Sequence, residues 1–452
     1  MWPIKSILYF AAFWFGCFAA LANPIWGVAN YMLVYQVHPP AHWWGEPLTA
    51  IGMRFSWMAT SFIVLGLVFA RKHVPRVKPA LSLWELWIGA LIFLGVLNTI
   101  AGIGFESSAR YAFEKFWKMQ VFVLILGRLA TTRKNLKVVI WTIVVGSLYL
   151  GYDAYTAPAW RFSLGRLDVF GGPDMATSSG ASAHLAAMLP IIGVAFLVSK
   201  QWRFKLLAAT AGMLTVNAII LCRTRSAFIG LLAGGVAAAV LAPRAKRYRI
   251  YLLMLLGGVV ATALTDTHYR ERMATLTDEE TLNEDPAVVA RADIWAMSGE
   301  LVLDHPLGVG LGNFSRAIGN YDVRYWNRSS HSTVVTCFAE LGIIGGLVFL
   351  AIVIESVRLV YRSSKRAHLS ANPLETKLIC YGLLVSVTTY MVTGLGTERF
   401  FCESLWWVLV LPLCLHRVVI GESACGADVP EHTLRAEPVV GFQRYGEASY
   451  AT

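Results

Sequence analysis

The residues best suited to chemistry are three arginines and one histidine. Arg223 and Arg225 lie between two apolar runs in LCRTRSAFIGL, Arg291 lies in a more polar stretch, and His331 opens another apolar run in NRSSHSTVVTCFAELG. A guanidinium binds two oxygens of a phosphate through its planar fork. A histidine at a helix N-terminus stays neutral beside the positive end of the helix dipole, so it can accept a proton near pH 7. Together these side chains predict a site with diphosphate-binding cations and a general base.

Such a site suits displacement at a carbon that carries a diphosphate leaving group. The histidine, with Ser329 or Ser330 as the expected N-cap of its helix, would deprotonate an attacking hydroxyl, and the arginines would neutralise charge on the departing diphosphate. Because this donor is already activated and no carboxylates stand at metal-ligand spacing, we expect neither a metal nor another cofactor. The alternative is that the arginines contact only lipid headgroups or solvent and that His331 is a bystander at the interface.

The composition indicates a membrane protein. Hydrophobic residues make up 56% and charged residues 15% of the 452 residues, which is not typical of soluble domains. A helix needs about 20 residues to cross about 30 Å of hydrocarbon. Runs of this kind predict an all-α polytopic bundle of about twelve transmembrane helices. They lie near 6–37, 49–70, 81–101, 112–130, 136–156, 179–199, 204–222, 226–242, 249–265, 332–357, 376–396 and 401–418.

Basic residues predict the orientation of these spans. They gather at every second connection, as the positive-inside rule requires of cytoplasmic loops, at 71–78, 131–137, 200–205, 243–249 and 362–366. The net charge of +11 then reflects topology, and we expect no nucleic-acid partner. The outward connections are 38–48, 102–111, 157–178, 223–225, 266–331 and 397–400. We favour one crossing within 6–37, with the part after Pro24 at the outer interface; the alternative is two crossings and an external N-terminus.

Residues 1–420 form one predicted membrane domain, which includes the outward loop 266–331, and residues 421–452 read as a disordered cytoplasmic tail. Within the loop, Asp285 and Pro286 are typical of a helix start, and His305-Pro306 of its end. An acidic run at 278–285 reads as a solvated face. The predicted packing face of the loop helix has three- and four-residue steps and consists of Val288, Ala292, Trp295, Gly299 and Val302.

The stretch DHPLGVGLGNF has glycines at alternate positions, Gly308, Gly310 and Gly312. It does not match the nucleotide-binding pattern, because the spacing is G-x-G-x-G, no strand precedes it, and an outward loop meets no nucleotide cofactor. We expect a tight turn, with positive φ, that packs the loop closely against helices.

An ordered series of motifs from about 170 to 350 resembles the O-antigen ligase and polymerase superfamily of bacterial envelope glycosyltransferases. The series is GGPDMATSSGASAHLAAMLPII, TRSAFIGLLAG, RADIWAMSGELVLDHPLGVGLGNF and HSTVVTCFAELGIIGGLVF. The resemblance implies a multi-pass protein of the bacterial inner membrane whose site faces the periplasm. It also implies transfer of a glycan from undecaprenyl pyrophosphate, without metal, to an acceptor such as a lipid-A core, another glycan or a protein hydroxyl.

The resemblance also implies roles for individual residues. The family's functional arginine at a helix start matches Arg225, its loop arginine matches Arg291, and its loop histidine, the base, matches His331. Arg223, Asp174 and Arg399 are added as further candidates from their positions alone. The chain departs from the family at Ser226, where Gly is usual, and at Ser332, where Asn is frequent.

Other functions remain open at this stage. A polysaccharide polymerase of the same superfamily shares these motifs. A transporter or flippase would place ionisable residues near the bilayer midplane, and Arg54, Glu85 and Glu340 do lie in apolar stretches. A non-catalytic envelope scaffold is a third alternative.

Overall fold

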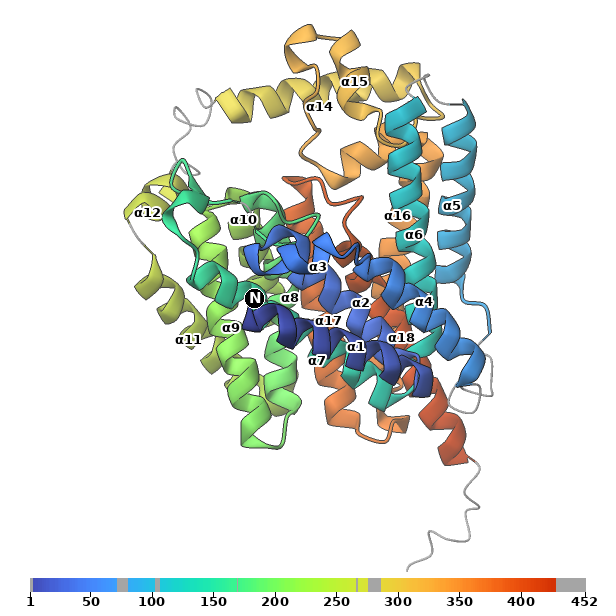
Figure 1. The fold of residues 1–452 in the computed structure, drawn as a ribbon, viewed down its shortest axis with the longest axis vertical. Helices are drawn as coiled ribbons and strands as arrows, with labels where there is room; N and C mark the ends of the chain where they lie inside the picture. Colours follow the sequence, from blue (N-terminus) through green and yellow to red (C-terminus); the bar gives the residue numbers. More distant parts are fainter. Residues whose placement is uncertain are drawn as a thin grey trace, which may run out of the picture.

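The computed structural model describes residues 3–70, 80–101, 106–168, 170–265, 267–274 and 286–427, which are almost entirely helical (Figure 1). The predicted acidic run 278–285 and the basic connection 71–78 lie outside these residues. The long helices are α1 (Ile4–Ala22), α2 (Ile25–Val37), α4 (Phe55–Phe69), α5 (Leu83–Ala101), α6 (Glu106–Leu129), α7 (Arg133–Tyr155), α8 (Ser178–Val198), α9 (Trp202–Cys222), α10 (Arg225–Leu241), α11 (Arg247–Leu264), α14 (Pro286–Asp304), α16 (Thr333–Lys365), α17 (Pro373–Leu395) and α18 (Glu403–Ala427).

Short elements connect the long helices. Two β-strands, β1 (Phe162–Ser163) and β2 (Arg166–Leu167), pair antiparallel, with Phe162 opposite Leu167. The short helices are α3 (Glu46–Ala50), α12 (Thr267–Ala274) and α15 (Phe314–Ala317), with 3-10 turns η1 (Pro39–Ala41), η2 (Trp43–Gly45), η3 (Ala159–Arg161), η4 (Arg244–Lys246), η5 (Ile318–Asn320), η6 (Val323–Tyr325) and η7 (Ala367–Leu369).

The helices confirm an all-α, multi-pass membrane protein. Among the residues described, nine helices are long and apolar enough to cross a membrane, and the bent pair Trp43–Ala50 and Phe55–Phe69 makes a tenth if it counts as one span. Each predicted apolar run falls on a helix, including α6 and the shorter α10. The helix α18 runs through the interior of the bundle and buries Trp406 and Trp407 completely. It continues to Ala427, into the predicted tail, and residues 428–452 lie outside the described part.

The bundle has two different ends. We call the end that carries α14, at the top of Figure 1, the loop end. We call the opposite end the basic end, because the described connections rich in Lys and Arg lie there: 131–137, 200–205, 243–249 and 362–366.

The first two helices form a hairpin that enters from the loop end and returns to it. The hydroxyl of Ser6 donates to the carbonyl of Trp44. The nearby His42 lies 3.8 Å from the carboxylate of Asp153, near the end of α7 that is opposite the basic end, so α1 begins at the loop end. At the turn between α1 and α2, the amide Nδ2 of Asn23 donates to Oδ1 of Asn135, at 3.5 Å, in the first turn of α7 at the basic end. Most residues of α2 are buried. Among the described residues, α1 is long and apolar enough to cross a membrane, whereas α2, with 13 residues, is not among the candidate spans. One crossing or two within 6–37 therefore stays a prediction.

The glycine-rich loop closes a break in α16. Gly342 has φ 71° and ψ −175°, which interrupts the helix. The amides of Val309 and Gly310 donate to the carbonyls of Ala339 and Glu340, at 2.9 and 3.1 Å, and the amide of Ile343 donates to the carbonyl of Pro306 at 3.0 Å. Gly308, Gly310 and Gly312 all have positive φ. The predicted close-packed turn is confirmed, and its backbone satisfies polar groups that the break exposes.

The loop helix α14 begins at Pro286 and ends before His305, as predicted, and Asp285 lies outside the described residues. Its predicted packing face is wrong at Ala292, Trp295 and Gly299, which are exposed, whereas Val302 does pack against the buried cluster. The buried side chains are those of Ile294, Ser298 and Leu301, which face the cluster of Val309, Phe314, Ala317, Ile318 and Ala339. Apolar residues occur on more than one side of this helix, and the cluster beneath it selects which side is buried.

We expect Gly342→Ala to lower the unfolding temperature of the detergent-solubilised protein. The conformation of Gly342 costs a residue with a Cβ about 1–3 kcal/mol, and the added methyl would overlap the carbonyl oxygen of Pro306. A thermal-shift measurement tests this. Gly257→Ala in α11, where the methyl meets nothing within 4 Å, is the matched control and should keep or raise the unfolding temperature. Equal unfolding temperatures for Gly342→Ala and the unsubstituted protein would contradict the close packing of Gly342 against the carbonyl of Pro306.

Candidate functional site

His331 lies in a tight turn just before α16. Its φ is 53°, and the N-cap of α16 is Ser332, whose hydroxyl accepts a hydrogen bond from the amide of Val335 at 3.4 Å. The expected caps Ser329 and Ser330 are therefore wrong by two or three positions. Ser330 instead holds the turn, because its hydroxyl accepts from the amide of Ser332 at 3.0 Å. The left-handed turn takes the imidazole out of the helix.

Burial lowers the pKa of His331, and the positive charges of Arg291 and Arg328 lower it further. A neutral imidazole was predicted from the helix dipole, but the two arginines and partial burial supply the cause here. The hydroxyl of Ser329 lies 3.4 Å from Nδ1. The side chain as a whole is half-buried, so a neutral, proton-accepting imidazole remains accessible near pH 7.

The loop helix α14 is fixed to this turn. The indole Nε1 of Trp295 donates to the carbonyl of Ser330 at 2.8 Å, and the hydroxyl of Tyr325 donates to Oδ2 of Asp293 at 2.7 Å. Arg291 lies one turn before Trp295 and on the same side of α14 as the buried Ile294. The charge of Arg291 acts on His331, so the structure brings the two residues together, although they are 40 positions apart in the chain.

The start of α10 and the start of α16 are both tied to the connection between α17 and α18. The hydroxyl of Ser226 lies 2.8 Å from that of Thr397. The hydroxyl of Thr333 donates to the carbonyl of Thr397 at 3.0 Å and accepts from the amide of Arg399 at 3.0 Å. Arg225, the first residue of α10, thus lies beside the same connection as the helix that follows His331.

Arg399 and Asp174 are also brought together. The guanidinium Nη1 of Arg399 donates to the backbone carbonyl of Asp174 at 2.8 Å. The carboxylate of Asp174 accepts from the hydroxyl of Tyr35 at 2.7 Å and forms an ion pair with Lys115. Burial raises the pKa of Glu398 in the same connection, although Arg399 and Lys115 lower it. Cationic side chains from α6 and from the connection therefore surround Asp174.

Arg223 lies in different surroundings from Arg225. It ends α9 in a left-handed conformation, with φ 47°, and its Nη1 lies against Gly165 in the β1–β2 turn. Between the two arginines, the hydroxyl of Thr224 lies 2.6 Å from that of Ser182 in α8. Arg223 therefore lies at the loop end, beside the β1–β2 turn, whereas Arg225 lies beside Thr397.

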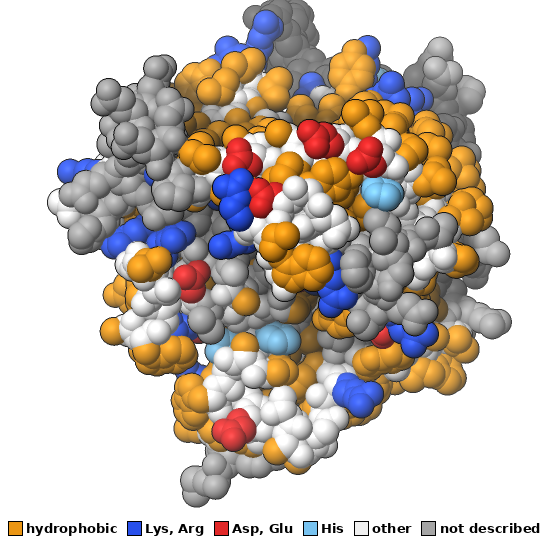
Figure 2. Space-filling view, turned by 90° about the horizontal axis from the view of Figure 1, so that it is seen from above, with side chains coloured by type: hydrophobic (Ala, Val, Ile, Leu, Met, Phe, Trp, Pro, Cys, Tyr) orange, Lys and Arg blue, Asp and Glu red, His pale blue; other side chains and the backbone are white. Residues whose placement is uncertain are grey.

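Seen from above, the loop end presents apolar areas with charged side chains among them (Figure 2). The most exposed apolar residues of the loop include Leu303, Leu307 and Val323, at 76%, 70% and 81% exposure. Within the described residues, no group of three or more His, Cys, Asp or Glu side chains could hold a metal ion.

Comparison with protein families supports the resemblance found in the motifs. Residues 210–350 match the sequence model of the O-antigen ligase family. This part of the chain is similar to the O-antigen ligase domain. No curated protein matches the chain in a sequence search. The matched stretch begins within α9 and ends within α16, so it includes Arg223, Arg225, Arg291 and His331. It indicates a function of the O-antigen ligase or polymerase type.

Several residues near the candidate site were not identified as candidates from the sequence. Lys115 and Glu398 border Asp174 and Arg399, and Thr397 ties two helix starts together. A signal for Lys115 was present, since a lysine inside an apolar run is costly without a partner. For Thr397 no signal exists in a single sequence, because its role depends on contacts with residues more than 60 positions away.

We expect Arg328→Gln to raise the pKa of His331, because it removes a positive charge that disfavours imidazolium. Diethyl pyrocarbonate modifies neutral imidazole, so the pH dependence of His331 modification, followed by mass spectrometry, reports the change. The midpoint should move to higher pH in Arg328→Gln. Arg358→Gln, at the basic end, is the control and should leave the midpoint in place. If the pH midpoint of His331 modification does not move in Arg328→Gln, the charge of Arg328 does not lower the pKa of His331.

Proposed function

We propose that the chain is a glycosyltransferase that moves a glycan from undecaprenyl pyrophosphate to an acceptor hydroxyl, at the periplasmic face of the bacterial inner membrane. The observation that carries the proposal is the convergence, at the loop end, of three segments of the stretch that matches the O-antigen ligase family. The start of α10 and the start of α16 share contacts with Thr397, and α14 is bonded to the turn of His331. The basic connections at the opposite end support a loop end that faces away from the cytoplasm.

In the proposed reaction, Nε2 or Nδ1 of His331 takes the proton of the acceptor hydroxyl. The hydroxyl oxygen attacks the anomeric carbon of the donor sugar, and the bond from that carbon to the diphosphate oxygen breaks. The electron pair leaves with the diphosphate, whose charge Arg225 and Arg291 neutralise. No step requires ATP, because the diphosphate is itself the leaving group.

Further cations at the loop end have supporting roles in this proposal. Two arginines are candidates for secondary contacts with the diphosphate. Arg399 is held on the carbonyl of Asp174, and Arg223 lies beside the β1–β2 turn. The ion pair of Lys115 with Asp174 fixes the segment that Arg399 contacts. These residues would add positive potential around the donor and attract its anionic headgroup.

The acceptor distinguishes a ligase from a polymerase. A lipid-A core or a protein hydroxyl would make the chain a ligase, and a growing polysaccharide would make it a polymerase with the same chemistry. Transport is less well supported, since two of the three ionisable residues named within apolar stretches, Glu85 and Glu340, have structural partners. Glu85 binds Arg128 and Arg417 at the basic end, and Glu340 accepts a hydrogen bond from the amide of Phe314 at 3.3 Å.

We expect His331→Ala to lower glycan transfer by about 10²- to 10⁴-fold, the usual contribution of a general base. The assay uses purified protein, a polyprenyl diphosphate-linked glycan and separate lipid-core, polysaccharide and protein acceptors. His305→Ala, a half-buried histidine at the end of α14, is the matched control and should remain active. Transfer by His331→Ala at a rate near that of the unsubstituted protein would show that the base is assigned wrongly.

We expect Arg291→Lys to lower transfer by about 10- to 100-fold, because a hydrogen bond to a charged group is worth about 1.5–3 kcal/mol and lysine lacks the planar fork. Initial rates in the same assay measure the effect. Arg324→Lys in the same loop, where the arginine side chain is 75% exposed and paired with Asp322, should be neutral. If Arg291→Lys is equally active, positive charge alone suffices at this position.

A further inference from the structure

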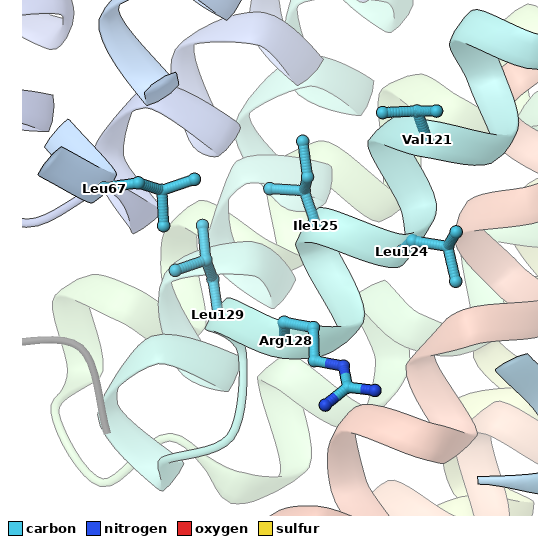
Figure 3. A pocket seen from close by; sticks show the side chains of 6 residues that line it. All are labelled: Leu67, Val121, Leu124, Ile125, Arg128 and Leu129. Carbon is cyan, nitrogen blue, oxygen red and sulfur yellow. The ribbon is translucent and has the colours of Figure 1, made fainter. Parts of the chain in front are cut away.

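A groove opens on the side of the bundle between α4 and α6, away from the site of His331. It has a volume of about 290 Å³ and is lined by Leu67 of α4 and by a face of α6. Figure 3 shows Leu67 across the groove from Ile125 and Leu129. The remaining lining residues are Val121, Leu124 and Arg128. Apart from this one arginine, the lining is aliphatic.

The groove lies near the basic end and faces the membrane. Leu67 stands two residues before the end of α4, and Leu129 is the last residue of α6. The surrounding side chains of Leu65, Val68 and Phe69 are 41%, 51% and 71% exposed. Lipid chains surround a multi-pass bundle at this depth, so a lipid chain is the molecule that reaches the groove.

The charges at the groove favour an anionic lipid. Glu85 forms ion pairs with both Arg128 and Arg417, each with a closest N–O distance of 2.6 Å. Two guanidinium groups share one carboxylate, so this cluster of three has a charge of +1. Arg417 has only 6% of its side chain exposed, whereas Arg128 has 36%. Of the two arginines, Arg128 is therefore the one that reaches the surface, and it lines the groove.

We propose that this groove binds an anionic phospholipid of the leaflet at the basic end, with one acyl chain along α6 and the phosphate beside Arg128. From Val121 to Leu129 the helix rises about 12 Å at 1.5 Å per residue, which accommodates part of an acyl chain. Basic residues beside grooves between transmembrane helices are a known means of binding anionic headgroups at the cytoplasmic side. The diphosphate of the proposed donor belongs at the loop end, at the far end of α6 from Arg128, so the two lipids occupy separate sites.

Native mass spectrometry of the full chain in a mild detergent tests the proposal with phosphatidylglycerol and phosphatidylethanolamine of identical acyl chains. The unsubstituted protein should bind phosphatidylglycerol more tightly. Arg128→Gln should lower affinity for phosphatidylglycerol about fivefold, as expected for one basic residue near an anionic headgroup, and leave phosphatidylethanolamine unchanged. Leu124→Trp, which fills the groove, should weaken both lipids. The controls Arg358→Gln and Val236→Trp, with side chains 61% and 65% exposed outside the groove, should change neither.

Two results would overturn the proposal. One is an unchanged ratio of the two affinities in Arg128→Gln together with unchanged binding in Leu124→Trp. The other is displacement of phosphatidylglycerol by undecaprenyl phosphate in the unsubstituted protein, combined with loss of undecaprenyl phosphate binding in Leu124→Trp. That second result would make the groove a site for the tail of the donor. Both variants retain Glu85 and Arg417, so the ionic contact between α5 and α18 is kept and folding is checked by gel filtration.

Discussion

Backbone hydrogen bonding inside the membrane is the constraint on which this structure depends. A helix that breaks within hydrocarbon leaves carbonyl and amide groups that no water can satisfy. In α16 the break at Gly342 is filled by residues 306–310, whose carbonyl and amide groups pair with those at the break. The carboxylate of Glu340 adds a further contact to the amide of Phe314. The loop is thereby anchored in the bundle at its C-terminal half.

This anchor determines where the candidate site lies. Residues 305–331 connect α14 to α16, and the anchored residues 306–310 directly follow α14, so fixing them also fixes the position of α14 above the bundle. Trp295 then reaches the carbonyl of Ser330, and Arg291 comes near His331. The loop is therefore a rigidly bonded cover, which is the arrangement that a site with several separated charged groups requires.

The two ends of the bundle use charge differently. At the basic end, carboxylates neutralise arginines in compact groups, as Glu375 and Glu422 do with Arg133. At the loop end, Arg291 lies near a neutral histidine, and Arg399 uses one nitrogen on a backbone carbonyl. A backbone carbonyl orients a guanidinium without cancelling its charge. Arg399 is therefore held by a neutral group at the end where the anionic donor is proposed to bind.

Amino-acid sequence alone determined the membrane class, the positions of the long helices after α2, the ends of α14 and the positive φ of the glycine turn. These features follow from local properties: apolar run length, Pro and Gly positions, and charge in short connections. Single-sequence patterns also identified Arg225, Arg291 and His331 as candidates, and the stretch that matches the O-antigen ligase family includes all three. Tertiary structure alone decided the buried face of α14, the hairpin of α1 and α2, the true cap Ser332, and the partnership of Asp174 with Lys115 and Arg399. Each of these depends on which distant surface meets a residue, and helix periodicity carries no information about the partner.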